Sequence, residues 1–157
     1  MNSSRSKTKI LLDTTYLLPI VGIDVENVET PLTILRNLYE LGEVVIYYTP
    51  FNILEILGKL SRISYKAERV KLGLRSIRES FKMIHPTMMG YMKALELRRK
   101  GFKDLIDLLL YTTSKTRKLE FLTRDEELIE FLRRVGEDVN NIVYEGEFIK
   151  KYSGYTA

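Results

Sequence analysis

The sequence predicts an α/β fold, a three-layer α/β/α sandwich with a mainly parallel central sheet. Two observations support this prediction. Short apolar runs alternate along the chain with longer segments that carry helix start and stop signals. The runs also lack the alternation of polar and apolar residues that is typical of a strand with one face in water. Strands of this kind are buried on both faces, so helices are expected on both sides of the sheet.

Five apolar runs have the composition of buried strands. They are rich in Ile, Leu, Val and Tyr, and residues typical of turns and helix caps lie between them and the next segments. Because the intervening segments are long enough to be crossover helices, neighbouring strands are expected to be parallel. The strands are expected over residues 9–12, 43–48, 81–84, 119–122 and 141–144.

Prolines, glycines and capping residues mark the helices. Pro31 and Pro50 suit the first helical position, Thr87 suits an N-cap, and Gly42 and Gly101 suit the residue after a last turn. A helix start follows the first strand over residues 14–18, and further helices are expected over 31–41, 50–61, 87–100, 104–114 and 126–135. The charged segment 64–80 is expected to be helical in one or two pieces, with a break near Gly73.

Composition narrows the classes of protein that the chain can belong to. Its 157 residues suit one domain. It has no cysteine and one histidine, which excludes a disulfide framework and makes a zinc site improbable. No apolar run approaches the roughly 18 residues of a membrane span, and the N-terminus lacks a signal-peptide pattern, so we expect a cytoplasmic protein without membrane partners. The net charge of +4 permits a polyanionic partner.

Four acidic residues lie where apolar segments meet polar ones: Asp13, Glu55, Asp107 and Asp125. A carboxylate that leaves water without compensation costs several kcal/mol or takes up a proton. Asp13 and Asp125 directly follow strands, at the sheet edge where parallel sheets bind ligands. A hard divalent cation takes oxygen ligands, so the four acids predict a shared metal pocket.

The aspartates also have structural explanations. Asp13 could cap the helix start after the first strand, and Asp125 lies in residues 123–126, which have the Thr-x-x-Glu form of a capping box. Asp104 stands where a helix begins, so its commonest role is that of N-cap, with an accessory place in the pocket as the alternative. Asp107 has apolar neighbours on both sides and is the hardest to explain without a metal.

Glu55 has two interpretations. Asn52, Lys59 and Arg62 share its helix face. In the first interpretation this face is a solvated polar stripe. In the second it is the wall of a cleft, with the basic side chains placed to meet phosphates.

Four segments carry the acids in a fixed order and spacing: residues 10–15, 49–57, 107–111 and 121–125. In this order they resemble the successive motifs of PIN-domain ribonucleases, with prokaryotic toxin-type and archaeal members. The resemblance covers residues 8–148, which we take as a PIN-like domain. Residues 1–7 are expected to be a disordered N-terminal tail, and residues 149–157 a C-terminal tail. Residues 111–114 depart from the family, because they are bulkier than its small apolar residues.

The resemblance implies an endoribonuclease that uses Mg²⁺ or Mn²⁺ to hydrolyse RNA phosphodiester bonds. The catalytic and metal-binding residues would be Asp13, Glu55, Asp107 and Asp125. Asp104 would be an accessory metal ligand, and the hydroxyl groups of Thr14 and Thr123 would support the site.

A basic run on and after the helix of Glu55 is the candidate RNA surface. Lysine and arginine there would contact phosphates, and a tyrosine would offer a face for stacking. A solvated helix face is the alternative. The candidate contacts are Lys59, Arg62, Tyr65, Lys66 and Arg69.

Apolar residues in the same region suggest a homodimer, and the toxin-type relatives suggest an antitoxin-like protein partner. The candidate dimer residues are Leu72, Leu74, Ile77 and Phe81. Two other functions stay open. One is a catalytically silent PIN-like module that binds RNA or a protein. The other, a receiver- or phosphatase-type domain with Asp13 phosphorylated, is disfavoured because Asp13-Thr14-Thr15 lacks the second nearby aspartate.

Overall fold

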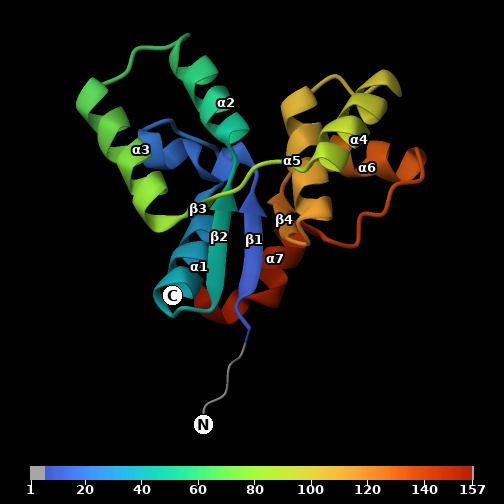
Figure 1. Cartoon of the computed structure of the whole chain (residues 1–157). Coiled ribbons are helices and arrows are strands. Elements are labelled where there is room, and N and C mark those ends of the chain that lie inside the picture. Colours follow the sequence, from blue (N-terminus) through green and yellow to red (C-terminus); the bar gives the residue numbers. More distant parts are fainter. Residues whose placement is uncertain (1–5, 157) are drawn as a thin grey trace.

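A sheet of parallel strands runs through the middle of the protein (Figure 1). The computed structural model describes residues 6–156. Within these residues the strand order is β3-β2-β1-β4-β5, and every neighbouring pair is parallel. The predicted α/β/α class is therefore confirmed. The strands are β1 (Thr8–Leu12), β2 (Val44–Tyr48), β3 (Lys82–Met83), β4 (Glu120–Thr123) and β5 (Ile142–Tyr144).

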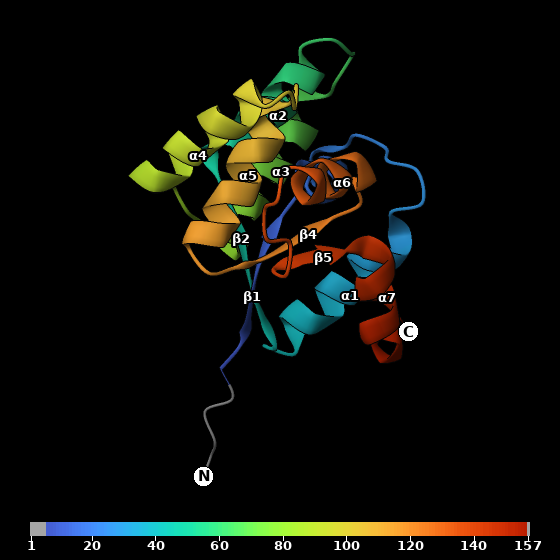
Figure 2. The ribbon, with the colours of Figure 1, turned by 90° about the vertical axis from the view of Figure 1, so that its right-hand side faces the viewer.

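Helices cover both faces of the sheet (Figure 2). They are α1 (Glu29–Glu40), α2 (Pro50–Leu60), α3 (Ala67–Ser80), α4 (Met88–Arg99), α5 (Leu105–Thr116), α6 (Glu126–Arg134) and α7 (Glu145–Lys151). Short 3₁₀ helices span Thr14–Tyr16, Leu18–Val21 and Ser153–Tyr155. Side chains of β1 alternate between two cores: Ile10 and Leu12 pack with α1 and α7, and Leu11 packs with α4, α5 and α6.

The predicted start signals form the expected caps. The Thr49 hydroxyl accepts hydrogen bonds from the backbone N–H groups of Phe51 (3.1 Å) and Asn52 (3.3 Å). The Asn52 side chain in turn accepts from the Thr49 N–H at 2.7 Å, which completes a capping box at the start of α2. The Thr87 hydroxyl caps α4 in the same way, by accepting from the Gly90 N–H. Local sequence therefore sets where these two helices begin.

Two expectations about helix boundaries were wrong. α3 continues through Gly73 without a break. A Cβ atom at Gly73 would lie 2.3 Å from the Ile20 carbonyl oxygen, so the glycine allows α3 to pack against the 3₁₀ helix Leu18–Val21. α1 begins at Glu29 rather than at Pro31. Proline is tolerated within the first turn, because N–H groups there have no intrahelical acceptor.

The segment expected to be a C-terminal tail packs on the body of the protein. α7 extends to Lys151, and Ile149, Tyr152 and Tyr155 pack against the core. The Tyr155 hydroxyl donates to the Glu43 carboxylate at 2.8 Å. These aromatic contacts give the segment the buried surface that a tail would lack. Of the expected N-terminal tail, residues 1–5 lie outside the described residues, and residues 6 and 7 have no regular secondary structure.

Most of the predicted dimer residues belong to the protein's own core. Ile77 is buried, and Leu74 and Phe81 are partly buried against the same core, whereas Leu72 is exposed. The apolar side of α3 therefore stabilises the monomer fold. Across residues 6–156, every helix is too short or too polar to cross a lipid bilayer.

The contact at Gly73 gives a stability prediction. Gly73→Ala should destabilise the protein by roughly 1–3 kcal/mol, because the added methyl group collides with the backbone at Ile20 and Val21. Gly58→Ala is the matched control. It lies inside α2 with no atom within 4 Å of the added Cβ, so it should stabilise by about 0.5–1 kcal/mol. Urea unfolding measures both; equal effects of the two substitutions would contradict the close packing.

Candidate metal centre

Acidic side chains from four elements line one pocket at the carboxyl ends of β1 and β4. Asp13 follows β1, Asp125 follows β4, Glu55 lies in α2, and Asp107 lies in the first turn of α5. One carboxylate oxygen from each of Asp13, Glu55 and Asp107 lies within 4.8 Å of the others. The pocket measures about 270 Å³, and Thr14, Lys59, Asp104 and Asp125 also line it. The acids singled out in the sequence therefore meet at the expected edge.

Asp13 occupies the N-cap position of the 3₁₀ helix Thr14–Tyr16. The side-chain hydrogen bond of Asp13 is made to the neighbouring strand, because its Oδ2 atom accepts from the Thr123 hydroxyl at 2.9 Å. The exposed fraction of Asp13 is 9%. Burial raises the pKa of Asp13 from 3.8 to about 6, although the Thr123 hydroxyl group and the Thr15 backbone at the helix start lower it and oppose part of this rise. Asp13 is thus a carboxyl group held in a position where its charge is disfavoured.

Thr123 connects two of the acids. Its hydroxyl donates to Asp13 and accepts from the Asp125 N–H at 3.1 Å. Asp125 caps α6 through Oδ1, which accepts from the Leu128 N–H at 3.1 Å. The capping explanation is therefore right for Asp125 itself. It is compatible with a place in the pocket, because the Asp125 side chain lines the pocket together with Asp107.

Asp104 and Asp107 occupy the start of α5. Asp104 is the N-cap, as expected: its Oδ1 accepts from the Asp107 N–H at 3.1 Å. The Asp104 side chain is exposed, and it lines the pocket beside Asp107. Burial raises the pKa of Asp107 well above its usual range, and the charges of Asp13 and Asp104 raise it further. In the protein without metal, Asp107 therefore holds its proton beyond the usual pH range of an aspartate.

Glu55 belongs to the cleft wall. Its Oε1 atom is buried and has no hydrogen-bond partner among the described residues. Asn52, one turn earlier, is fully buried and donates from Nδ2 to the Leu12 carbonyl (3.1 Å) and to the Thr14 hydroxyl (3.0 Å). The solvated-stripe interpretation is thus wrong for Asn52. Its capping-box position after Thr49 was the signal that could have identified it as a residue that ties α2 to the end of β1.

Oxygen donors of this kind fit a hard divalent metal. Buried carboxyl groups repel one another when ionised, and a buried oxygen without a partner is unfavourable unless a cation or a donor binds it. Arg124 lines the same pocket, but its guanidinium donates to Glu145 and to the carbonyl groups of Glu26 and Asn27. A Mg²⁺ or Mn²⁺ ion would satisfy Asp13, Glu55 and Asp107 together.

The candidate RNA contacts separate into two groups. Lys59 lines the acidic pocket. Tyr65 and Lys66 line a second hollow beyond the end of α2. Arg62 lies just before them in the sequence, and its side chain is exposed. Arg69 lines that hollow too, but its guanidinium donates to the carbonyl groups of Pro19 (3.1 Å) and Ile20. Arg69 therefore holds the 3₁₀ helix Leu18–Val21 against α3.

A family model and two solved structures agree with the fold described above. A family model described as PIN domain matches residues 10–136. The structure of VapBC2 from Rickettsia felis, bound to a DNA fragment from its promoter, is similar, with a TM-score of 0.62 and 18% identity over 88% of this chain and 98% of that chain. VapC20 from Mycobacterium tuberculosis, a toxin that cleaves the sarcin-ricin loop, has a TM-score of 0.58 and 13% identity, covering 83% and 97% of the two chains. No curated protein matches the sequence.

The raised pKa of Asp107 predicts a pH-dependent stability. A carboxyl group with a higher pKa in the folded state binds more protons there, so the metal-free protein loses stability as pH rises above about 4. Asp107→Asn removes the part of this loss that Asp107 causes, whereas the part caused by Asp13 remains. At pH 8, and without metal, it should be more stable than the wild type by roughly 1–3 kcal/mol.

Chemical denaturation between pH 4 and 8, in the presence of a chelator, measures the difference. Asp24→Asn is the control, because Asp24 is exposed and outside the pocket. A wild-type advantage at pH 8 would show that the Asp107 charge is not destabilising.

Proposed function

The chain belongs to the PIN domain family, and we propose that it is an endoribonuclease that uses Mg²⁺ or Mn²⁺ to hydrolyse RNA phosphodiester bonds. The observation that carries the proposal is the meeting of Asp13, Glu55 and Asp107 within 4.8 Å, with a buried Glu55 oxygen that has no partner among the described residues. The Mycobacterium tuberculosis neighbour is described as a toxin that cleaves the sarcin-ricin loop, which is in keeping with the proposal.

The acids divide into ligands and supporting groups. Asp13, Glu55 and Asp107 would hold the metal, Asp125 would complete the site, and Asp104 would be an accessory ligand at its edge. A bound divalent ion supplies Lewis-acid activation of the phosphodiester and of the attacking water. The chain contains no cysteine, so thiolate nucleophilic catalysis is excluded.

Other residues fix the ligands in place. The Thr123 hydroxyl donates a hydrogen bond to Oδ2 of Asp13, and this bond holds the carboxyl group in one orientation. Asn52 holds the end of β1 through the Leu12 carbonyl and fixes the Thr14 hydroxyl. The Lys59 side chain provides positive charge at the pocket, where it can attract an RNA phosphate.

The protein partners, like RNA, stay predictions. The Rickettsia felis neighbour is a VapBC2 structure, which supports a toxin-type role with an antitoxin-like partner. A homodimer would need an apolar surface other than that of α3. Exposed apolar side chains occur on α2 and α4, among them Leu54, Leu57, Met88, Met89, Met92 and Leu95.

Cleavage of single-stranded RNA tests the proposal. The wild type should cleave in Mg²⁺ or Mn²⁺ and lose activity when a chelator is added. Asp13→Asn and Asp107→Asn should each lower the rate by about 100-fold or more, because each removes a charged ligand of the ion. Asp138→Asn, at an exposed position paired with Lys115, is the control and should keep full activity. Equal rates in all four proteins would exclude the acidic pocket as the active site.

A further inference from the structure

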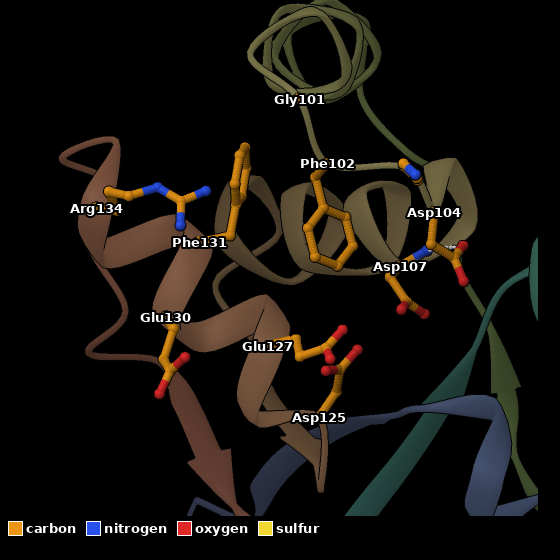
Figure 3. Close-up of a pocket in the computed structure, with 10 residues that line it drawn as sticks. Gly101, Phe102, Asp104, Asp107, Asp125, Glu127, Glu130, Phe131 and Arg134 are labelled. Carbon is orange, nitrogen blue, oxygen red and sulfur yellow. Dashed lines mark hydrogen bonds between the residues drawn. The ribbon is translucent and has the colours of Figure 1, made fainter.

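A larger hollow, distinct from the one lined by Tyr65 and Lys66, adjoins the acidic pocket (Figure 3). It measures about 560 Å³ and shares Asp104, Asp107 and Asp125 with the metal centre. From these acids it extends along α6 to Phe131 and Arg134. A polymer whose phosphate group lies at the metal centre would therefore place a neighbouring nucleotide in this hollow.

Aromatic rings form one wall of the hollow. Gly101 has φ +121°, a conformation that other residues rarely adopt, and the turn at this residue directs Phe102 towards α6. The Phe102 ring centroid lies 5.1 Å from that of Phe131. Phe131 is buried, whereas Phe102 is only half-buried and its ring faces the hollow beside Asp107 (Figure 3). An exposed ring face is the surface on which an unpaired base stacks.

The charged side chains that line the hollow favour the base of a nucleotide over its phosphate group. Glu127 and Glu130 line it together with the three shared aspartates, whereas the basic lining residues are Lys103 and Arg134. The aspartates belong to the proposed metal centre, so Glu127 and Glu130 are the carboxylates of the hollow that remain for a base. An ionised carboxylate only accepts hydrogen bonds, so it repels phosphate and attracts the N–H groups of a base. In Figure 3 the Glu127 carboxylate points towards Asp125, below the Phe102 ring, and that of Glu130 points away from it. Glu127 is therefore the acid placed to contact a base stacked on Phe102.

We propose that this hollow is a base-binding subsite, in which a base stacks on Phe102 and its N–H edge donates to Glu127, with guanine preferred. Guanine presents a ring N–H and an amino group side by side, which match the two oxygens of one carboxylate. Uracil presents a single N–H group. The subsite rests on the proposed ribonuclease function, since it lies next to the same metal centre, and it assigns a specificity to that enzyme.

Short U-rich RNAs that carry one guanine, one inosine or no purine test the subsite. Inosine keeps the ring N–H but lacks the amino group. The wild type should cleave beside guanine at least about tenfold faster than at the same position in the uracil-only RNA, with inosine between the two. Glu127→Gln should remove the preference without abolishing cleavage. Glu126→Gln should retain it, because Glu126 lies on the same helix but contacts the Tyr144 hydroxyl.

Two outcomes would overturn the subsite while leaving the nuclease in place. They are cleavage without base preference in the wild type and an unchanged base preference in Glu127→Gln. If Glu127→Gln keeps the preference but needs more Mn²⁺, Glu127 belongs to the metal centre. Fluorescence anisotropy measures the affinity for the same RNAs without requiring cleavage, with Ca²⁺ in place of Mg²⁺ or Mn²⁺. If the wild type cuts no RNA, the proposed function fails separately, and equal affinity for the guanine and uracil RNAs would then overturn the subsite.

Discussion

Several carboxyl groups crowd into one small pocket, with Asp13 buried and Glu55 and Asp107 half-buried, and the elements around the pocket are arranged to hold them there. Ionised carboxylates this close repel one another, and burial adds a desolvation cost. The raised pKa values of Asp13 and Asp107 have these two causes. A divalent cation would convert the repulsion into attraction, so the pocket is unfavourable when empty of metal and favourable when filled. The surrounding elements hold the acids together despite this cost.

Two central strands and two helix starts provide that support. β1 and β4 are neighbours, and the Asp13 N–H donates to the Leu122 carbonyl at 3.0 Å, so Asp13 and Thr123 lie side by side. α2 is anchored at the same edge by Asn52, and α5 begins there with Asp104 as its cap. The residues that cap these helices and the proposed metal ligands are thus adjacent or identical. Arg124 adds a clamp, since its guanidinium joins Glu145 at the start of α7 to the loop before α1.

Local signals in the sequence were sufficient for the strands, most helix starts and the position of the acidic edge. Thr49-Pro50 and Thr87 form their caps from residues close in sequence, so the pattern alone identifies them. Contacts between distant segments were not predictable in this way. The approach of Gly73 to Ile20 and the packing of Tyr155 against the core both depend on the assembled fold. Asn52 illustrates both cases, because its capping role is local whereas its hydrogen bond to Leu12 is not.

Counting the protons released on Mn²⁺ binding tests whether the acidic pocket is a metal centre. Calorimetric titration at pH 6, in two buffers with different ionisation enthalpies, gives both the affinity and the proton count. At that pH the metal-free protein holds a proton on Asp107, and a fraction of the molecules also holds one on Asp13. Binding should therefore release about one proton or more per ion. The release should fall in Asp107→Asn. Absence of Mn²⁺ binding, or binding without proton release, would contradict a metal centre built from these buried carboxyl groups.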